Sequence, residues 1–440
     1  MVILGHMTEV TRILSMIGQH VKNSLHHLSW PQRKWNKNMP AILQRNRFVC
    51  GIGLLILLAI PAMAKPPGGK GGGNGGGGED PPPPPTPEVS YSIEFLDTLG
   101  GVDITAYGMN GQGDVVGQSD TEVIGTRSWQ HGYLYSYQAT AMIDLHDLFV
   151  AEGLLNDPID TDTGTGWLVS SAIDVNDAGQ IIGTLKEAVA GVGVGQVPFR
   201  YTPADGTGGS AVLEEINPLI PGSDITVRAV NNSGVVAGYA QAADGYDHAI
   251  VWSNSIDGTA DLGLLNGQDT ITNDISDAGE LCGQLNGVSR AWRLGSSGFD
   301  NLGKLQKGKS GSSFGNSINL LGDVAGLSSK NSTTYRVFLY TDANGMQDLG
   351  TLGGNDSYGG YLNNLGEVVG TSRLASETTS HAFLYTQEAM VDLEESIAGF
   401  SASSYYGLLT PLGINDTGTI LGVTSNGTGL DRQVFVLTRN

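Results

Sequence analysis

The feature of this sequence that most constrains its fold is an imperfect tandem repeat, which begins near residue 92 and continues to the C-terminus. Each repeat contains an anchor glycine that directly follows two apolar residues. These anchor glycines are Gly117, Gly183, Gly238, Gly283, Gly326, Gly370 and Gly422. Their spacing of 43 to 66 residues is longer than the coil of a β-solenoid. It is also shorter than a β-sandwich domain, which needs about 100 residues.

A second glycine lies four residues before each anchor glycine, and a turn-forming residue lies three residues earlier still. The turn-forming residues are Asn110, Asn176, Asn231, Ser276, Asn319, Asn363 and Asn415. An asparagine side chain can bond the backbone two residues further on, and glycine accepts the positive φ that ends such a turn. Each Asn-x-x-Gly segment therefore predicts a tight hairpin between two antiparallel strands.

Two further apolar runs follow each hairpin except the last, which is followed by one. One is aromatic and β-branched, as in Val434-Phe435-Val436, and the other resembles the segment from Met346 to Leu352. Four short strands per repeat, named A to D in chain order, with no amphipathic helical pattern between them, are typical of a β-propeller blade. The predicted fold is therefore all-β, a seven-bladed β-propeller of four-stranded antiparallel blades.

The two ends of the repeat region complement each other. The last repeat stops after its C strand, with Leu437 three residues from the C-terminus, and lacks a D strand. Residues 93–101 form an orphan D-like segment before the first hairpin. We therefore expect the N-terminal strand to complete the last blade, with Phe95 and Phe435 in one sheet. Such pairing would close the ring and leave no open sheet edge.

The motifs DLGTLGG, N-x-x-G-x-V-x-G and HAFLY resemble those of the bacterial HAF-family extracellular repeat proteins. The resemblance covers residues 92–437 and is strongest over residues 346–385. It implies an exported repeat protein and implies no particular activity. Seven residues occupy the position of the HAF histidine: His131, Val197, His248, Arg290, Arg336, His381 and Gln433. Because this position accepts such different side chains, we do not expect it to be a repeated ligand.

The sequence before the repeats divides into three segments. Residues 1–38 are basic and irregular, and we interpret them as a non-native N-terminal extension, with translation starting at Met39. Residues 39–64 have the basic start, the short apolar run and the Ala-Met-Ala site of a secretory signal peptide. Residues 65–88 are a Gly- and Pro-rich linker that we expect to be disordered. The predicted propeller occupies residues 89–440.

Charge and cysteine content narrow the choice of partner and compartment. The chain has 23 Lys and Arg against 44 Asp and Glu. Residues 1–64 hold seven basic residues and one acidic residue, which leaves 16 against 43 and a formal net charge of −27. This acidity argues against nucleic acid and against anionic membrane surfaces. Cys282, the one cysteine after residue 64, is expected to be a buried hydrophobe. We expect a secreted, extracellular or periplasmic monomer that does not insert into a membrane after signal cleavage.

Insertions of variable length gather on one predicted face, where the B–C loops and the D–A crossovers open. Loops on a rigid scaffold commonly carry binding residues, so this loop-rich face is the candidate ligand surface. Its candidate residues are Asp157, Asp160, Asp162, Trp167, Glu394, Glu395, Tyr405 and Tyr406. For any single one of them, an ordinary polar loop remains the simpler explanation.

Three short motifs resemble known sites. Residues 303–310 fit a phosphate-binding loop and residues 311–315 fit a nucleophile elbow. Both sites need a strand that leads into a helix, and because this repeat is antiparallel and all-β we interpret both matches as coincidence. Asp160 and Asp162 precede a glycine and could bind calcium, but the other ligands of an EF-hand loop are missing. A structural loop is favoured there, and calcium is the one cofactor that the sequence leaves open.

Three functions are compatible with these features. The first is an exported, non-enzymatic binding or surface-interaction module that engages an extracellular glycan or protein on its loop-rich face. The second is an extracellular polysaccharide hydrolase or lyase that uses acidic residues of the same face. The third is a structural surface component without a discrete ligand. A hydrolase would need two carboxylates at a fixed separation across the central pocket.

Overall fold

The computed structural model describes most of residues 89–440. Residues 1–88, which include the extension, the signal-like segment and the linker, lie outside the described residues, so their assignment stays a prediction. Within the part that is described, no helix is both long enough and apolar enough to cross a membrane. The described residues are 89–121, 129–155, 166–188, 194–206, 208–253, 258–308, 310–376, 379–387, 389–397, 400, 408–425 and 432–440.

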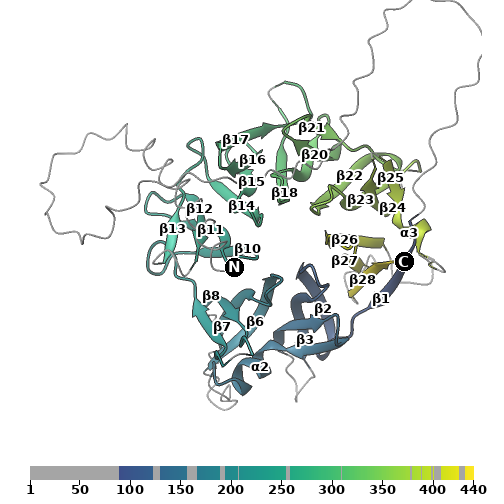
Figure 1. The fold of residues 1–440 in the computed structure, drawn as a ribbon. Helices are drawn as coiled ribbons and strands as arrows, with labels where there is room; N and C mark the ends of the chain where they lie inside the picture. The colour runs from purple at the N-terminus through teal and green to yellow at the C-terminus, as the bar shows by residue number, and fades with distance from the viewer. Residues whose placement is uncertain are drawn as a thin grey trace, which may run out of the picture. The chain divides into compact units, whose positions relative to one another are not determined.

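The first hairpin repeat forms a four-stranded antiparallel sheet. Its strands, in order from A to D, are β2 (Gly100–Met109), β3 (Val115–Thr121), β4 (Gln130–Ser136) and β5 (Ala141–Asp144). Each strand pairs with its neighbour in sequence. The A strand lies on the axial side of the sheet, as the inward position of β2 in Figure 1 shows. This arrangement is that of a propeller blade, as predicted.

Six further sheets repeat this pattern around a ring (Figure 1), which confirms the predicted seven-bladed β-propeller. Blades 2 to 4 consist of β6 (Gly166–Val175), β7 (Ile181–Ala188), β8 (Val194–Thr202) and β9 (Val212–Glu215); β10 (Ile225–Val230), β11 (Val236–Gln241), β12 (Asp247–Trp252) and β13 (Thr259–Asp261); and β14 (Thr270–Ile275), β15 (Leu281–Leu285), β16 (Arg290–Gly295) and β17 (Gly298–Gly303). Blades 5 to 7 consist of β18 (Ser313–Ile318), β19 (Val324–Ser329), β20 (Tyr335–Thr341) and β21 (Gly345–Asp348); β22 (Gly353–Leu362), β23 (Val368–Leu374), β24 (Ser380–Thr386) and β25 (Ala389–Asp392); and β26 (Leu408–Ile414), β27 (Ile420–Ser425), β28 (Gln433–Arg439) and β1 (Tyr91–Phe95).

The last blade is closed by the N-terminal strand, as predicted. Strand β1 pairs antiparallel with β28, and Phe95 lies opposite Phe435 in the register. Tyr91 lies opposite Arg439, and the Arg439 guanidinium donates to the Tyr91 hydroxyl at 3.0 Å. Because β1 pairs with β28 from Phe435 to Arg439, the seam has no unpaired C strand.

The residue in the middle of each C strand packs in the core, and it is aromatic in six blades and Ile250 in blade 3. Tyr133, Phe199, Trp292, Phe338, Phe383 and Phe435 are all fully buried. In the ladders, Phe383 lies directly opposite anchor glycine Gly370 on the B strand. The conserved spacing of the repeat therefore places a large ring opposite a residue without a side chain. Burial of each such ring contributes about 1.5–3 kcal/mol.

Each A strand carries a β-bulge that the sequence pattern did not reveal. In blade 5 the register shifts between Gly315 and Ser317, so that Asn316 is the extra residue. A Cβ placed on anchor glycine Gly326 would collide with the carbonyl oxygen of Phe314. The anchor glycine is thus required by the close approach of the bulged neighbouring strand.

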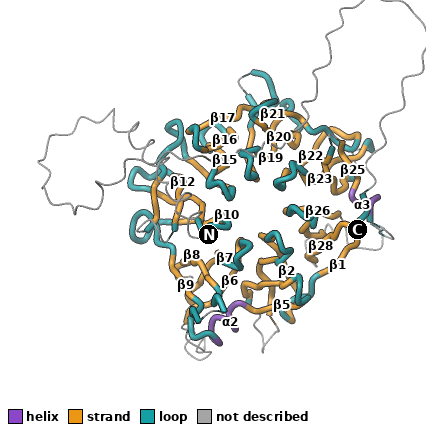
Figure 2. The backbone as a smooth tube through the Cα atoms, in the orientation of Figure 1, coloured by secondary structure: helices purple, strands orange, loops and turns teal. Residues whose placement is uncertain are grey.

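Two short helices lie in D–A crossovers where the sequence predicted loops (Figure 2). They are α2 (Leu145–Ala151) and α3 (Leu393–Ser396). Asp144 and Asp392 cap them, because each carboxylate accepts hydrogen bonds from backbone N–H groups of the first turn. This capping chemistry is local, and neither helix is long enough to show a helical periodicity in the sequence.

Candidate functional site

The asparagine of each A–B turn holds its own hairpin. In blade 6 the Asn363 Oδ1 accepts hydrogen bonds from the backbone N–H groups of Leu365 and Glu367, both at 3.0 Å. Turn glycine Gly366 adopts a φ of +78°. These contacts account for the Asn-x-x-Gly signature in the way that the sequence indicated.

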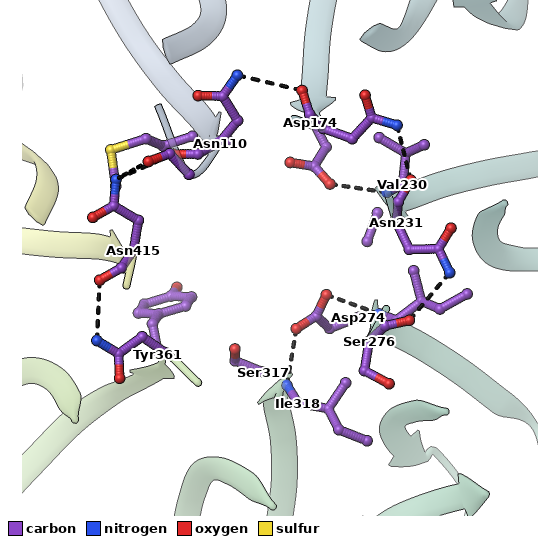
Figure 3. Close-up of a pocket in the computed structure, with 18 of the residues that line it drawn as sticks. Asn110, Asp174, Val230, Asn231, Asp274, Ser276, Ser317, Ile318, Tyr361 and Asn415 are labelled. Atoms are coloured by element: carbon purple, nitrogen blue, oxygen red, sulfur yellow. Dashed lines mark hydrogen bonds between the residues drawn. The ribbon is translucent and has the colours of Figure 1, made fainter. Parts of the chain in front are cut away.

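The same asparagines also connect neighbouring blades, which the sequence did not indicate. The Asn363 Nδ2 donates to the backbone carbonyl of Asn415 in the next blade at 3.0 Å. Equivalent bonds of 2.8–3.4 Å join Asn110 to Asn176, Asn176 to Asn231, Asn231 to Ser276, Asn319 to Asn363, and Asn415 to Asn110. Figure 3 shows several of these bonds around the axis. Ser276 is the one member of this ring without a side-chain amide.

The residue after each ring member forms an outer layer at the mouth of the axis. Asp177 accepts a bond from the Gly111 N–H at 2.7 Å, and Asn232 places its amide between Asp177 and Asp277 at 2.9 Å from each. On the other side, Asn364 donates its side-chain amide to Asp416 at 2.9 Å. Five of the seven members of this layer are therefore Asp or Asn, and the other two are Gly111 and Leu320.

A cavity of about 380 Å³ occupies the axis at this end of the propeller. It is lined by the ends of the seven A strands and by the A–B turns. The charged side chains in its lining are Asp174, Asp177, Asp274, Asp277, Asp416 and Arg228. Five carboxyl groups against one guanidinium give the cavity an acidic character.

Asp174 and Asp274 point into the open centre of this cavity (Figure 3). Each directly follows the bulged residue of its A strand. A bulge turns the following side chains relative to a regular strand, and bulges are common where a side chain must be aimed. In the other blades this position holds Gly108, Ala229, Ser317, Tyr361 and Gly413. The two aspartates therefore break the sevenfold regularity of the channel wall.

Hydrogen bonds hold both carboxylates in place. Asp174 accepts from the N–H of Val230 in the next blade and from the N–H of Val175, both at 2.9 Å. Asp274 likewise accepts from the N–H groups of Ile318 and Ile275, at 2.9 and 2.8 Å. Each aspartate thus ties its blade to the next one, which is a sufficient structural role.

The environment nevertheless raises the pKa of both carboxyl groups. Burial raises the pKa of Asp174 from 3.8 to about 7, and repulsion from Asp274 adds to this rise against the opposing effect of the two N–H donors. Burial raises the pKa of Asp274 to about 6, while its N–H donors and the Ser317 hydroxyl act in the opposite direction. Carboxyl groups that titrate near neutrality in a cavity are candidates for function.

Sequence reasoning missed these two residues. The available signal was a short motif shared by two repeats, Asp174-Val-Asn-Asp-Ala-Gly and Asp274-Ile-Ser-Asp-Ala-Gly. Each motif begins two residues before the ring position, where no other repeat has an acid. The motif became interpretable once the bulge showed that this position faces the axis.

The candidates chosen on the loop-rich face are only partly described. Asp157, Asp160, Asp162, Tyr405 and Tyr406 lie outside the described residues, and the calcium hypothesis for Asp160 and Asp162 lies there with them. In the ranges that are described, no group of three or more His, Cys, Asp or Glu side chains could hold a metal ion.

The other three candidates lie at D–A crossovers, at the end of the blades opposite the cavity. Trp167 is 36% exposed at the start of β6, whereas Glu394 is 7% exposed in the first turn of α3. Burial raises the pKa of the Glu394 carboxyl, although the adjacent His381 opposes this effect, with its Nε2 3.5 Å from Glu394 Oε2. Glu395 is exposed beside it. A ligand role for all three stays a prediction.

The HAF histidines have a structural role. His131, His248 and His381 each bond through Nδ1 to an aspartate at the end of the adjacent D strand, namely Asp144, Asp261 and Asp392, at 2.6–2.8 Å. In blade 5 an arginine replaces the histidine, and Arg336 lies 3.7 Å from Asp348. The position therefore ties strand C to strand D, which agrees with its tolerance of different side chains.

The two motifs interpreted as coincidence lie at strands β17 and β18, rather than between a strand and a helix. Ser313, the serine of the elbow-like motif, is buried, and its hydroxyl donates to the Gly303 carbonyl at 2.5 Å. The segment that resembles a phosphate-binding loop follows antiparallel strand β17 and leads to strand β18. Cys282 is fully buried, as predicted.

Comparison with known proteins gives no family. No protein-family model and no curated protein sequence matches the chain. Among solved structures, the chain is similar to virginiamycin B lyase from Staphylococcus aureus in complex with quinupristin, with 12% identity, a TM-score of 0.45, and 79% of this chain and 99% of that chain covered. It is also similar to TolB from Acinetobacter baumannii, with 11% identity, a TM-score of 0.38, and 79% and 96% covered. Similarity at this level assigns neither activity nor ligand.

Proposed function

We propose that this protein is an exported, non-enzymatic binding module whose ligand enters the axial cavity from the side of the A–B turns. The observation that carries the proposal is the irregular wall of that cavity. The asparagine ring repeats because the fold needs it, whereas Asp174, Asp274 and Tyr361 stand at a position where the other four blades have Gly, Ala or Ser. A cavity of about 380 Å³ lies within the range that binds small ligands or protruding side chains.

Export rests on the signal-like residues 39–64, on the acidic composition and on the resemblance to extracellular repeat proteins. The ligand class of this proposal is an extracellular glycan or protein. Acidic and amide side chains around a polar cavity suit either class, because both offer many hydrogen-bond donors. The loop-rich face remains a second surface on which such a partner could bind.

The experiment is a ligand screen by thermal unfolding of residues 88–440, because a ligand that binds only the folded state raises the midpoint. The panel contains polysaccharides, peptides and calcium, with EDTA as a control. Its matched variant is Gly413→Trp, since a Cβ at Gly413 meets no atom within 4 Å and the added ring would fill the cavity. Binding to the wild type that disappears in the folded variant supports the proposal. Binding that survives in the variant rules out the axial cavity as the site.

A polysaccharide hydrolase is the second candidate, because two carboxyl groups with raised pKa values face one cavity. Such a pair could divide the roles of general acid and base. Both groups, however, are held by two backbone N–H donors each, which accounts for their presence without catalysis. Release of reducing ends from a polysaccharide, lost in both Asp174→Asn and Asp274→Asn, would favour the enzyme over the binding module.

A further inference from the structure

Three large apolar side chains are exposed on two neighbouring A–B turns. Leu320 and Leu321 in blade 5 are 51% and 73% exposed, and Leu365 in blade 6 is 67% exposed. The two turns are joined, because the Leu320 N–H donates to Asn364 Oδ1 at 2.7 Å. We call these three residues the leucine patch. Leu320 also lines the axial cavity, so the patch continues into the cavity mouth.

The fold does not require these leucines. The same two turn positions hold Gly111 and Gln112, Asp177 and Ala178, Asn232 and Ser233, Asp277 and Ala278, and Asp416 and Thr417 in the other blades. Those turns form the same inter-blade hydrogen bonds with polar or small residues. Exposed apolar side chains that are grouped beside a polar site commonly mark an interaction surface.

The rest of the mouth is acidic. Asp177 and Asp277 lie on the turns of blades 2 and 4, Asp416 lies on the turn of blade 7, and Asp174 and Asp274 lie further inside. An occupant must therefore combine positive charge with an apolar part. A second copy of this chain is a poor fit, because the whole sequence carries a formal charge of −21. An anionic membrane surface is disfavoured for the same reason.

We propose that the mouth binds a polypeptide segment of another protein that inserts one lysine or arginine side chain into the axial cavity and packs neighbouring apolar side chains on the leucine patch. This proposal rests on the proposed function and specifies its ligand class. The aspartates supply the charge complementarity, and the patch supplies the apolar contact. Because Arg228 is the one cation among the lining residues, one inserted cation meets little repulsion.

The test is isothermal titration of the propeller with three capped hexapeptides at 50 mM NaCl. The first contains one lysine next to two leucines, the second has glutamine in place of the lysine, and the third has serines in place of the leucines. We expect the second and third to bind at least tenfold more weakly than the first. Binding of the first should weaken severalfold at 300 mM NaCl, because its charged contact is screened.

Protein variants separate the two parts of the surface. The double variant Leu321→Ser with Leu365→Ser should weaken the first peptide at least fivefold, and Gly413→Trp should abolish its binding. The control Val288→Ser removes an exposed apolar side chain from the B–C loop of blade 4 and should leave binding unchanged.

Each other outcome overturns the inference. Equal binding of the lysine and glutamine peptides would exclude the charged contact. If N-acetyl-lysine methylamide alone binds as tightly as the first peptide, a contribution of the leucine patch to binding is excluded. If a polysaccharide binds in a manner that Gly413→Trp abolishes while no peptide binds, the inference fails and the proposed function stands. If neither class binds the wild type, both fail.

Discussion

The side-chain amide of Asn415 donates to the backbone carbonyl of Asn110 at 3.2 Å, although the two residues are 305 positions apart in the sequence. This bond crosses the seam between the last blade and the first. On the outer side of the same seam, β1 pairs with β28. The ring is therefore closed twice, once by a strand and once by a side chain.

The strand closure should dominate stability. A truncation that starts at residue 97 removes β1 together with Tyr91, which is fully buried. We expect it to lose at least about 3 kcal/mol of unfolding free energy, the usual cost of deleting one buried aromatic side chain. A truncation that starts at residue 86 keeps the strand and should match the longer chain in urea denaturation. Equal midpoints for both truncations would contradict the closure.

Replacing Ser276, the one ring member without a side-chain amide, by asparagine should raise the stability of the protein. Ser276 accepts a bond from the Glu280 N–H at 3.1 Å but is too short to reach the next blade as asparagine does. We expect Ser276→Asn to add a bond to the Asn319 carbonyl and to raise the unfolding free energy by about 0.5–1.5 kcal/mol. The reverse change, Asn363→Ser, should lower it by a similar amount. Chemical denaturation measures both, and a loss of stability in Ser276→Asn would show that the ring is already complete.

The hairpins could be predicted from sequence because their signal is a short local motif. The ring closure could be predicted by counting the strands in each repeat. The side chain of Asn363 and the positive φ that Gly366 accepts predict one turn. The last repeat lacks a D strand, and the segment around Phe95 is the unassigned strand that can supply it. The cavity residues could not be found in this way. Asp174 and Asp274 sit in ordinary strand sequence, and the bulge that directs them inward leaves no pattern of its own.

The sequence also could not show which face of the propeller carries the candidate site. Variation in loop length directed attention to the D–A crossovers, where Glu394 proves to be almost buried within α3. The A–B turns looked uninformative because their length is constant. Their functional signal lies in side chains such as Leu321, which differ between blades while the turn itself stays the same. Constant backbone and variable side chains are what a repeat scaffold needs for a binding site.

The anchor glycines should not tolerate a side chain. A methyl group at Gly326 would collide with the Phe314 carbonyl, a backbone atom held in a strand ladder. We expect Gly326→Ala to cost about 3 kcal/mol, the upper part of the range for overpacking. The matched control is Gly413→Ala, whose methyl group meets nothing within 4 Å and should change stability by less than about 0.5 kcal/mol. Similar urea midpoints for the two variants would contradict the close approach.

The channel carboxyl groups should make stability depend on pH in a defined direction. The pKa of Asp174 rises from 3.8 to about 7 in the folded state, and that of Asp274 rises to about 6. Between pH 4 and pH 7 the folded state therefore holds more protons than the unfolded state, so the contribution of these groups to stability falls as pH rises through this window. The contribution becomes constant about one pH unit above the pKa of Asp174, where both groups are ionised in the folded and in the unfolded state.

Substitution of each aspartate by asparagine tests this dependence. The slope of melting temperature against pH is compared, because asparagine also loses one acceptor oxygen and so changes the absolute stability. We expect Asp174→Asn and Asp274→Asn to show a smaller decline in melting temperature between pH 4 and pH 7 than the wild type. The double variant should show the smallest decline. Asp103→Asn, at the exposed start of β2, is the control and should keep the wild-type slope. Parallel curves for the wild type and the channel variants would mean that both carboxyl groups are ionised throughout, with their N–H donors outweighing the effect of burial.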